Sequence, residues 1–348
     1  MNRRTITGIL KANSIQYVWA GFPVLFAAIF YALGRAPTLS EWDSIGLIIA
    51  ATALILGTAS QLANAYADRD EDWLYVPSNP LVTGELAAGT ARKALIVQNI
   101  LCGLLLIALL VVSDFNYPLI IVMVVGWCFG LAYSLPPFRF KETLASPFTH
   151  ALAATMVPIA GWLVVESSLV AQDGFIIAFS AFFFVHLVAF GVTVKLRKTH
   201  EDLNGGQIQV EEGKGISDLR TSGLGLRVKT AVAIEAVVGL GAFILIPIYW
   251  GLGIFDKELS IALLTLPLLF MILTVVTRVR NPLGNAYRCG MFMAMACVFI
   301  VFSFLGIALA DIIHWAFIVL AFVFFTAVFA ILQRVTRPFG PSFRPIQV

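Results

Sequence analysis

Charged residues are scarce in this 348-residue chain: Asp, Glu, Lys and Arg make up 12% of it, while 59% is hydrophobic. A soluble domain carries about 25% charged residues, so a soluble globular class is excluded. Cysteine is scarce too, and the four cysteines lie within apolar runs without any C-x-x-C pair. This pattern favours small buried hydrophobes over disulfides or metal ligands. What remains is the composition of a polytopic membrane protein.

Apolar runs long enough to cross a bilayer recur along the whole chain. A spanning helix needs about 20 mostly apolar residues. Ten runs qualify: 17–34, 45–67, 93–113, 116–134, 146–166, 174–196, 228–250, 258–277, 288–310 and 313–334. The last two are separated only by ADIIHW, so one broken helix is an alternative to two. The expected fold is all-α: a polytopic transmembrane helical bundle of nine or ten spans around a central cavity, in a single domain covering residues 1–348.

Positive charge is distributed unevenly between the two sides of this bundle. With the N-terminus in the cytoplasm, 21 of the 23 Lys and Arg residues fall on inner segments, and only Arg35 and Lys257 fall outside. This distribution follows the positive-inside rule and predicts that both termini are cytoplasmic. The basic, then apolar N-terminus lacks a small-residue cleavage site, so we expect a retained first span. The longer inner connections carry most of the polar residues, which predicts a functional site on the cytoplasmic side.

A cluster of acids and amides, NAYADRDEDW, follows the second apolar run. Asn64, Asp68 and Asp72 recur every four residues, which predicts that they share one face of a helix. Carboxylate and amide oxygens suit Mg²⁺, and the two carboxylates would repel each other without a cation. Asp70 and Glu71 are expected to point elsewhere, toward solvent. A solvated helix end is the alternative, but the regular spacing favours a metal site.

Three motifs, in order, resemble those of the UbiA-type intramembrane prenyltransferases. The N-x-x-x-D-x-x-x-D spacing that starts at Asn64 is similar to the family's first aspartate-rich motif. NPLVTG at 79–84 resembles its R-P-L-x-S/T-G run, with Asn79 replacing the Arg and removing one phosphate contact. YSLPPFRFK at 133–141 resembles its Y-S-x-P-P-x-x-x-K run. The resemblance covers roughly residues 15–310. Because the family usually has nine spans, the C-terminal helix at about 313–334 is an addition.

The family's second acidic motif, K-D-x-x-D-x-x-G-D, is only partly present after the sixth apolar run. With Lys198 set on the motif's Lys, Thr199 stands at the first Asp, Asp202 at the second and Gly206 at the third. One of three expected carboxylates remains, which weakens a second metal site. An ordinary helix-surface ion pair between Lys198 and Asp202 is the alternative interpretation.

The resemblance implies roles for further residues. Tyr133 and Lys141 match the family's Tyr and Lys near the diphosphate and the reacting carbon, although interfacial anchoring also fits them. Asp202 is expected to be both catalytic and metal-binding. His200 is a candidate base, with a solvated histidine as the alternative. Four cations are expected to bind the diphosphate, by a bidentate fork or as point charges: Arg139, Lys195, Arg197 and Lys198.

The activity that the resemblance implies is Mg²⁺-dependent transfer of a prenyl group from a prenyl diphosphate to an aromatic or lipid acceptor, within the lipid bilayer. The Mg²⁺ ligands would be Asn64, Asp68, Asp72 and Asp202, and the metal would stabilise the leaving diphosphate. The weakened second motif keeps a terpene cyclase of the same family as an alternative. An organic-anion transporter is a remote third, because it would place polar residues at mid-membrane. No nucleic-acid partner is expected.

Overall fold

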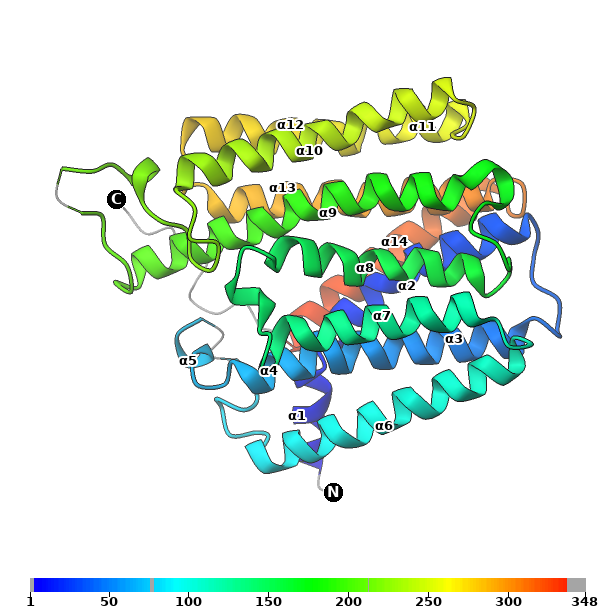
Figure 1. The fold of residues 1–348 in the computed structure, drawn as a ribbon, viewed down its shortest axis with the longest axis horizontal. Helices are drawn as coiled ribbons and strands as arrows, with labels where there is room; N and C mark the ends of the chain where they lie inside the picture. The colour runs from blue at the N-terminus through cyan, green and yellow to red at the C-terminus, as the bar shows by residue number, and fades with distance from the viewer. Residues whose placement is uncertain (1–2, 76–77, 212, 337–348) are drawn as a thin grey trace.

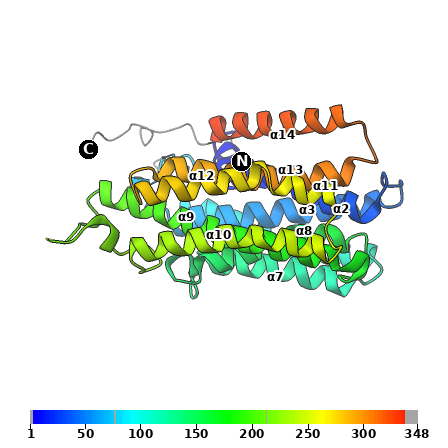
Figure 2. The same cartoon turned by 90° about the horizontal axis from the view of Figure 1, so that it is seen from above.

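The computed structural model describes residues 3–75, 78–211 and 213–336. In this part of the chain, helices joined by turns and loops are the regular secondary structure, and there is no β-strand. The helices are α1 (Arg3–Ala12), α2 (Ile15–Leu33), α3 (Trp42–Ile55), α4 (Ala63–Ala67), α5 (Asp72–Tyr75), α6 (Ala88–Val112), α7 (Tyr117–Ser134), α8 (Ser146–Leu163), α9 (Ala171–Asn204), α10 (Val228–Gly251), α11 (Lys257–Leu263), α12 (Leu266–Arg280), α13 (Ala286–Leu309) and α14 (Trp315–Thr336). A π-helical segment, Leu56–Leu62, joins α3 to α4. The long helices run side by side in a bundle (Figures 1 and 2), which confirms the predicted fold class.

Nine helical segments of the described residues are long and apolar enough to cross a membrane. They are Ile15–Leu33, Trp42–Ala67, Ala88–Val112, Tyr117–Ser134, Gly174–Asn204, Val228–Gly251, Lys257–Arg280, Ala286–Leu309 and Trp315–Leu332. The tenth predicted run, 146–166, forms α8 but is not among them. Helix α8 contains His150 and Pro158 and packs against α2, α7 and α9. Because most of its surface faces other helices, it does not need a continuous apolar run. The described residues thus agree with the prediction of nine or ten spans: nine helical segments meet the length and composition criterion, and α8 runs beside them in the bundle.

The predicted C-terminal addition is a separate helix, so α13 and α14 are not one broken element. Helix α14 lies along one edge of the bundle, where it packs on α2 and α13 (Figure 2). The Trp19 indole of α2 donates a hydrogen bond to the backbone oxygen of Phe325 at 3.2 Å. The rings of Phe302 and Phe322 meet edge to face at 4.7 Å. Aromatic contacts therefore hold this helix to the bundle.

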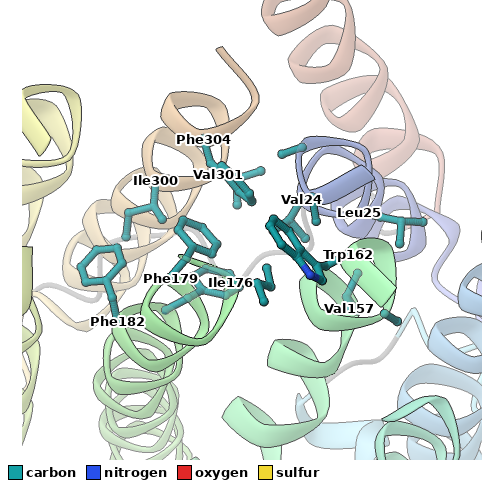
Figure 3. Packing of buried hydrophobic residues seen from close by; sticks show 14 of the residues in the cluster. Val24, Leu25, Val157, Trp162, Ile176, Phe179, Phe182, Ile300, Val301 and Phe304 are labelled. Carbon is teal, nitrogen blue, oxygen red and sulfur yellow. The ribbon is translucent and has the colours of Figure 1, made fainter. Parts of the chain in front are cut away.

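An aromatic core fills the bundle around the first turns of α9. Tyr31, at the end of α2, stacks on Phe175 with ring centroids 3.9 Å apart. Phe304 of α13 packs on Phe179 at 4.2 Å, and Trp162 of α8 closes the group, as Figure 3 shows. These side chains lie at the C-terminal end of α2 and the N-terminal end of α9. The opposite ends of the same two helices are left for polar residues.

At that opposite end, three connections gather on one side of the molecule (Figure 1). They join α4 to α6, α7 to α8 and α9 to α10. Arg35 and Lys257, the two cations that the charge distribution predicted outside, follow α2 and begin α11 at the far end. Which of the two ends faces the cytoplasm stays a prediction, and both chain termini, residues 1–2 and 337–348, lie outside the described residues.

Candidate active site

A polar pocket of about 230 Å³ lies where these connections meet the bundle. Its walls come from the α1–α2 junction, the end of α4 with the turn after it, the segment before α6 and the last turns of α9. The lining residues are Lys11, Ala12, Ser14, Asn64, Ala65, Asp68, Glu71, Asp72, Ser78, Asn79, Pro80, Val194, Arg197, Lys198 and Glu201. The first aspartate-rich motif and part of the second therefore face one space, although about 130 residues separate them along the chain.

Asn64, Asp68 and Asp72 all line the pocket, but they do not lie on one continuous helix as the spacing predicted. Helix α4 ends at Ala67, Asp68 caps it with φ −95° and ψ 1°, and α5 begins only at Asp72. The N–H groups of Asp68 and Asp72 still donate to the backbone oxygens four residues earlier, at 2.9 and 2.8 Å. This hydrogen-bond spacing carries through the turn and keeps the three polar side chains at the same pocket.

Asn79 fixes the last acid of this motif. Its side-chain Nδ2 donates to Oδ2 of Asp72 at 2.6 Å and to the backbone oxygen of Ala65 at 3.1 Å, and only 4% of the residue is exposed. Its Oδ1 accepts from the N–H of Leu81 at 3.0 Å. The residue that replaces the family's Arg thus orients a carboxylate. The sequence had indicated only a lost phosphate contact.

Basic residues of the α7–α8 connection pair with acids of the pocket. Lys141 forms an ion pair with Oδ1 of Asp68, and Arg139 pairs with Glu71 at 2.6 Å and with Asp68 at 3.6 Å. Lys198 of α9 reaches Glu71 from the other side at 3.9 Å. The prediction that Glu71 points away from the site is wrong, although its side chain stays 42% exposed. The turn after Ala67 takes Glu71 out of helical phase and brings it to the pocket.

Burial is the strongest influence on Lys141 and lowers its pKa to about 8. Attraction by Glu142 opposes this shift, while repulsion from Lys198 and Lys195 adds to it. The carboxylate of Asp68 also favours the charged ammonium. Lys141 and Arg139 do not line the pocket themselves, but Lys141 is a desolvated lysine that contacts the lining residue Asp68.

The partial second motif lies on a helix and not in a loop, because α9 continues past the predicted end at 196 to Asn204. Successive residues of a helix differ by about 100° in direction, so neighbours face different ways. Val194, Arg197, Lys198 and Glu201 face the pocket. Asp202 is not among the lining residues, although the family's motif had placed the metal ligand there.

Lys195, Thr199 and Asp202 bind neighbouring loops on another side of α9. Lys195, 6% exposed, donates to the backbone oxygen of Lys141. Asp202, 5% exposed, accepts from the hydroxyl of Ser222, and the Ser222 N–H donates to Oγ1 of Thr199 at 2.9 Å. The two predicted residues Lys195 and Asp202 are thus engaged in holding the connections around the pocket.

Glu201 is the acid that α9 contributes to the pocket. Its Oε1 accepts from the hydroxyl of Tyr287 at 3.0 Å and lies 3.5 Å from Nε of Arg197. His200, a predicted catalytic candidate, lies beside the pocket: its Nε2 is 2.9 Å from the Asn204 amide, and its ring meets the Tyr287 ring edge to face at 5.9 Å.

Tyr133, the other predicted catalytic aromatic, is not a lining residue, and its ring lies 6.0 Å from that of His150. Sequence reasoning missed Glu71, Lys11 and Tyr287 as members of the site. Lys11 lines the pocket and pairs with Glu85 at 2.8 Å. Glu71 lies inside the acidic segment but out of its four-residue spacing, whereas Lys11 and Tyr287 come from segments that only folding brings close, so no local pattern marks them.

The donor atoms of the pocket suit a hard cation such as Mg²⁺. Two amides and four carboxylates line it: Asn64, Asn79, Asp68, Glu71, Asp72 and Glu201. Within the described residues, no three His, Cys, Asp or Glu side chains are grouped closely enough to hold an ion by themselves. Mg²⁺ usually keeps several waters and binds one or two carboxylates together with substrate phosphates. The arrangement therefore fits a cation that a diphosphate helps to hold.

Comparisons with known proteins bear on the family and the fold of this chain. The model of the UbiA prenyltransferase family matches residues 20–296. No curated protein matches. A structure of digeranylgeranylglyceryl phosphate synthase in membranes has a TM-score of 0.60 at 16% identity, covering 88% of this chain and 99% of that one.

Two structures of a UbiA homolog from Archaeoglobus fulgidus also share the fold. The one bound to DMAPP and Mg²⁺ has a TM-score of 0.55 at 18% identity and covers 85% of this chain and 98% of its own. The one bound to GPP and Mg²⁺ has a TM-score of 0.55 at 18% identity and covers 84% and 99%. Identities this low show the fold alone. The family match, however, spans most of the chain and includes the pocket residues from Asn64 to Glu201. The chain belongs to the UbiA prenyltransferase family.

Proposed function

We propose that this protein is an Mg²⁺-dependent intramembrane prenyltransferase that ionises a prenyl diphosphate and transfers the prenyl group to an aromatic or lipid acceptor. The observation that carries the proposal is the meeting of the acidic segment 64–72 with the segment 194–201, which supplies Arg197, Lys198 and Glu201, at one polar pocket beside an apolar bundle. Membership of the family supports it. So do the solved structures of a homologue bound to prenyl diphosphates and Mg²⁺.

The metal ligands in this proposal are Asn64, Asp68, Asp72 and Glu201. Glu201 takes the place expected for Asp202, because Glu201 lines the pocket and Asp202 holds Ser222. When bound, the cation would neutralise diphosphate oxygens and so stabilise the leaving group. The cations proposed for the diphosphate are those that reach the pocket or its acids: Arg139, Lys141, Arg197 and Lys198.

The reaction breaks the allylic carbon–oxygen bond, and the electron pair leaves with the diphosphate. The acceptor then supplies the electron pair of the new bond and releases a proton. Arg139 and Lys141 would stabilise the charge that develops on the diphosphate, since fixed charges in a desolvated site act strongly on a transition state. The apolar helices next to the pocket keep water from capturing the allylic cation. The charge distribution supports a cytoplasmic position for this chemistry.

The test is diphosphate release by the purified protein in lipid nanodiscs with Mg²⁺ and prenyl diphosphates of about 10 to 20 carbons, with and without an aromatic or lipid acceptor. We expect release to require both Mg²⁺ and an acceptor. A hydrocarbon or cyclic alcohol formed without acceptor would instead identify the protein as a terpene cyclase. Absence of diphosphate release from every substrate would refute both activities.

A further inference from the structure

We propose that Tyr287 is a positioning residue that holds the carboxylate of Glu201 in the pocket for a divalent cation. This inference rests on the proposed function, in which Glu201 is a metal ligand. Tyr287 is the second residue of α13 and does not itself line the pocket. Its hydroxyl donates to Oε1 of Glu201 at 3.0 Å, across a sequence separation of 86 residues. The tyrosine therefore acts through the glutamate and not on the substrate.

Glu201 needs such a partner because its own helix does not fix it in place. Its side chain is 24% exposed, and Arg197, one turn earlier on α9, lies at 3.5 Å from the same oxygen. Because Arg197 lies on the same face of α9, its attraction for the Glu201 carboxylate acts along the helix axis. A hydrogen bond from α13 restrains it from a second direction, while the other oxygen, Oε2, has no role in either contact. Hydrogen-bonded outer partners commonly orient metal-binding carboxylates in this way.

The place of Tyr287 is itself fixed by the turn between α12 and α13. Nη1 of Arg278 donates to the backbone oxygen of Pro282 at 2.8 Å, and Leu283 in the same turn is buried. Arg278 is fully buried and pairs with the equally buried Glu235 of α10 at 3.2 Å. An interhelical ion pair thus anchors the turn from which Tyr287 extends. Breaking such a buried pair is strongly destabilising, so the anchor is rigid.

The contact of Tyr287 with His200 allows two roles of Tyr287 to be distinguished: packing by its ring and orientation of Glu201 by its hydroxyl. The two rings meet edge to face at 5.9 Å and nearly perpendicular, at 87°. Tyr287→Phe keeps this ring contact and removes only the hydroxyl. A role in packing alone would therefore survive Tyr287→Phe, whereas a role in orienting Glu201 would be lost.

The experiment titrates Mn²⁺ into the purified protein in nanodiscs together with inorganic diphosphate as co-ligand, and reads the free ion by electron paramagnetic resonance against a protein-free titration of the same diphosphate concentration. Loss of an outer-shell partner typically weakens metal binding about 10- to 100-fold, and we expect this range for Tyr287→Phe. In a Glu201→Gln background, adding Tyr287→Phe should change the affinity no further, because the two residues act as one unit. Tyr249→Phe, on α10 beside Phe255 and outside the pocket, is the matched control and should bind Mn²⁺ like the wild type.

Two outcomes would overturn the inference. One is unchanged Mn²⁺ affinity in Tyr287→Phe; the other is an equal loss on adding Tyr287→Phe to wild type and to Glu201→Gln. Melting curves of all variants in the same nanodiscs separate loss of fold from loss of affinity. Asp68→Asn distinguishes this failure from that of the proposed function: if Asp68→Asn binds Mn²⁺ like the wild type, the proposed metal site itself is wrong.

Discussion

Glu201 and Asp202 are adjacent acids on α9 for which sequence and structure predict opposite roles, so removing each charge separately tests the site. The variants are Glu201→Gln and Asp202→Asn. Glu201 lines the pocket, whereas Asp202 accepts a hydrogen bond from Ser222 on the far side of the helix. Since α9 turns by about 100° per residue, one carboxylate cannot take the direction of the other without unwinding the last turn.

Glu201→Gln is expected to change the Mg²⁺ dependence, and Asp202→Asn is expected to change the stability. Losing an outer-shell partner of a metal costs about 10- to 100-fold, so losing a direct ligand should raise the half-saturating Mg²⁺ concentration of Glu201→Gln by at least about 100-fold. Asp202→Asn removes a charge-assisted hydrogen bond of about 1.5–3 kcal/mol but leaves an oxygen that can still accept from Ser222. The cost should therefore fall near the lower end, about 1.5 kcal/mol, and appear in stability while the Mg²⁺ dependence stays as in the wild type.

The assay measures the initial rate of diphosphate release against Mg²⁺ concentration, together with a thermal melt of each variant in nanodiscs. If Asp202→Asn raises the Mg²⁺ requirement and Glu201→Gln does not, the assignment of the pocket face of α9 is wrong. In that case the family's motif, and not the helical phase, would identify the ligand.

Three further outcomes are expected. Asn79→Ala removes the amide hydrogen bond to Asp72, together with the one to Ala65 that holds the amide in place, and should raise the half-saturating Mg²⁺ concentration about 10- to 100-fold in the same rate assay; an unchanged Mg²⁺ dependence would contradict the role of Asn79. Lys141→Met keeps the buried side-chain bulk but removes a charged contact of about 1.5–3 kcal/mol, so kcat/KM for prenyl diphosphate should fall about 10- to 100-fold; an unchanged kcat/KM would argue against a contact between Lys141 and the diphosphate. Chelation of divalent cations with EDTA should abolish diphosphate release, and excess Mg²⁺ should restore it; persistent release after chelation would exclude the metal proposal.

Sequence patterns located the first acidic segment because its signal is local. Asn64, Asp68 and Asp72 reach the pocket through hydrogen bonds between residues four apart, and these persist even where the helix ends. Family spacing was less reliable for the second segment, because a one-residue difference in register on a helix changes the direction that a side chain faces. The family spacing favoured Asp202 as the metal ligand, whereas in the structure Glu201 is the acid of α9 that lines the pocket.

Other features depend on contacts that no local pattern encodes. The end of α4 at Ala67 brings Glu71 to the pocket, and only the folded chain carries Tyr287 to Glu201. The place of α8 also depends on its neighbours. Hydropathy measures suitability for lipid, and α8 is surrounded by other helices, so its composition does not report its place in the bundle.

The ion pairs of the pocket bear on how it would take up a charged substrate. Arg139, Lys141 and Lys198 each pair with an acid from the segment 68–71. A diphosphate alone, or a divalent cation alone, would leave some of these groups without partners. The loss is costly above all for Lys141 and Asp68, whose side chains are 8% and 14% exposed, because an unpaired buried charge costs several kcal/mol. When both bind, the diphosphate can replace the carboxylates as partner of the basic residues, and the acids can turn to the metal. Uptake by exchange of partners keeps every charge compensated. It also explains how a pocket with an incomplete second acidic motif can still serve a diphosphate, because the basic side chains of this chain already supply part of the compensating charge.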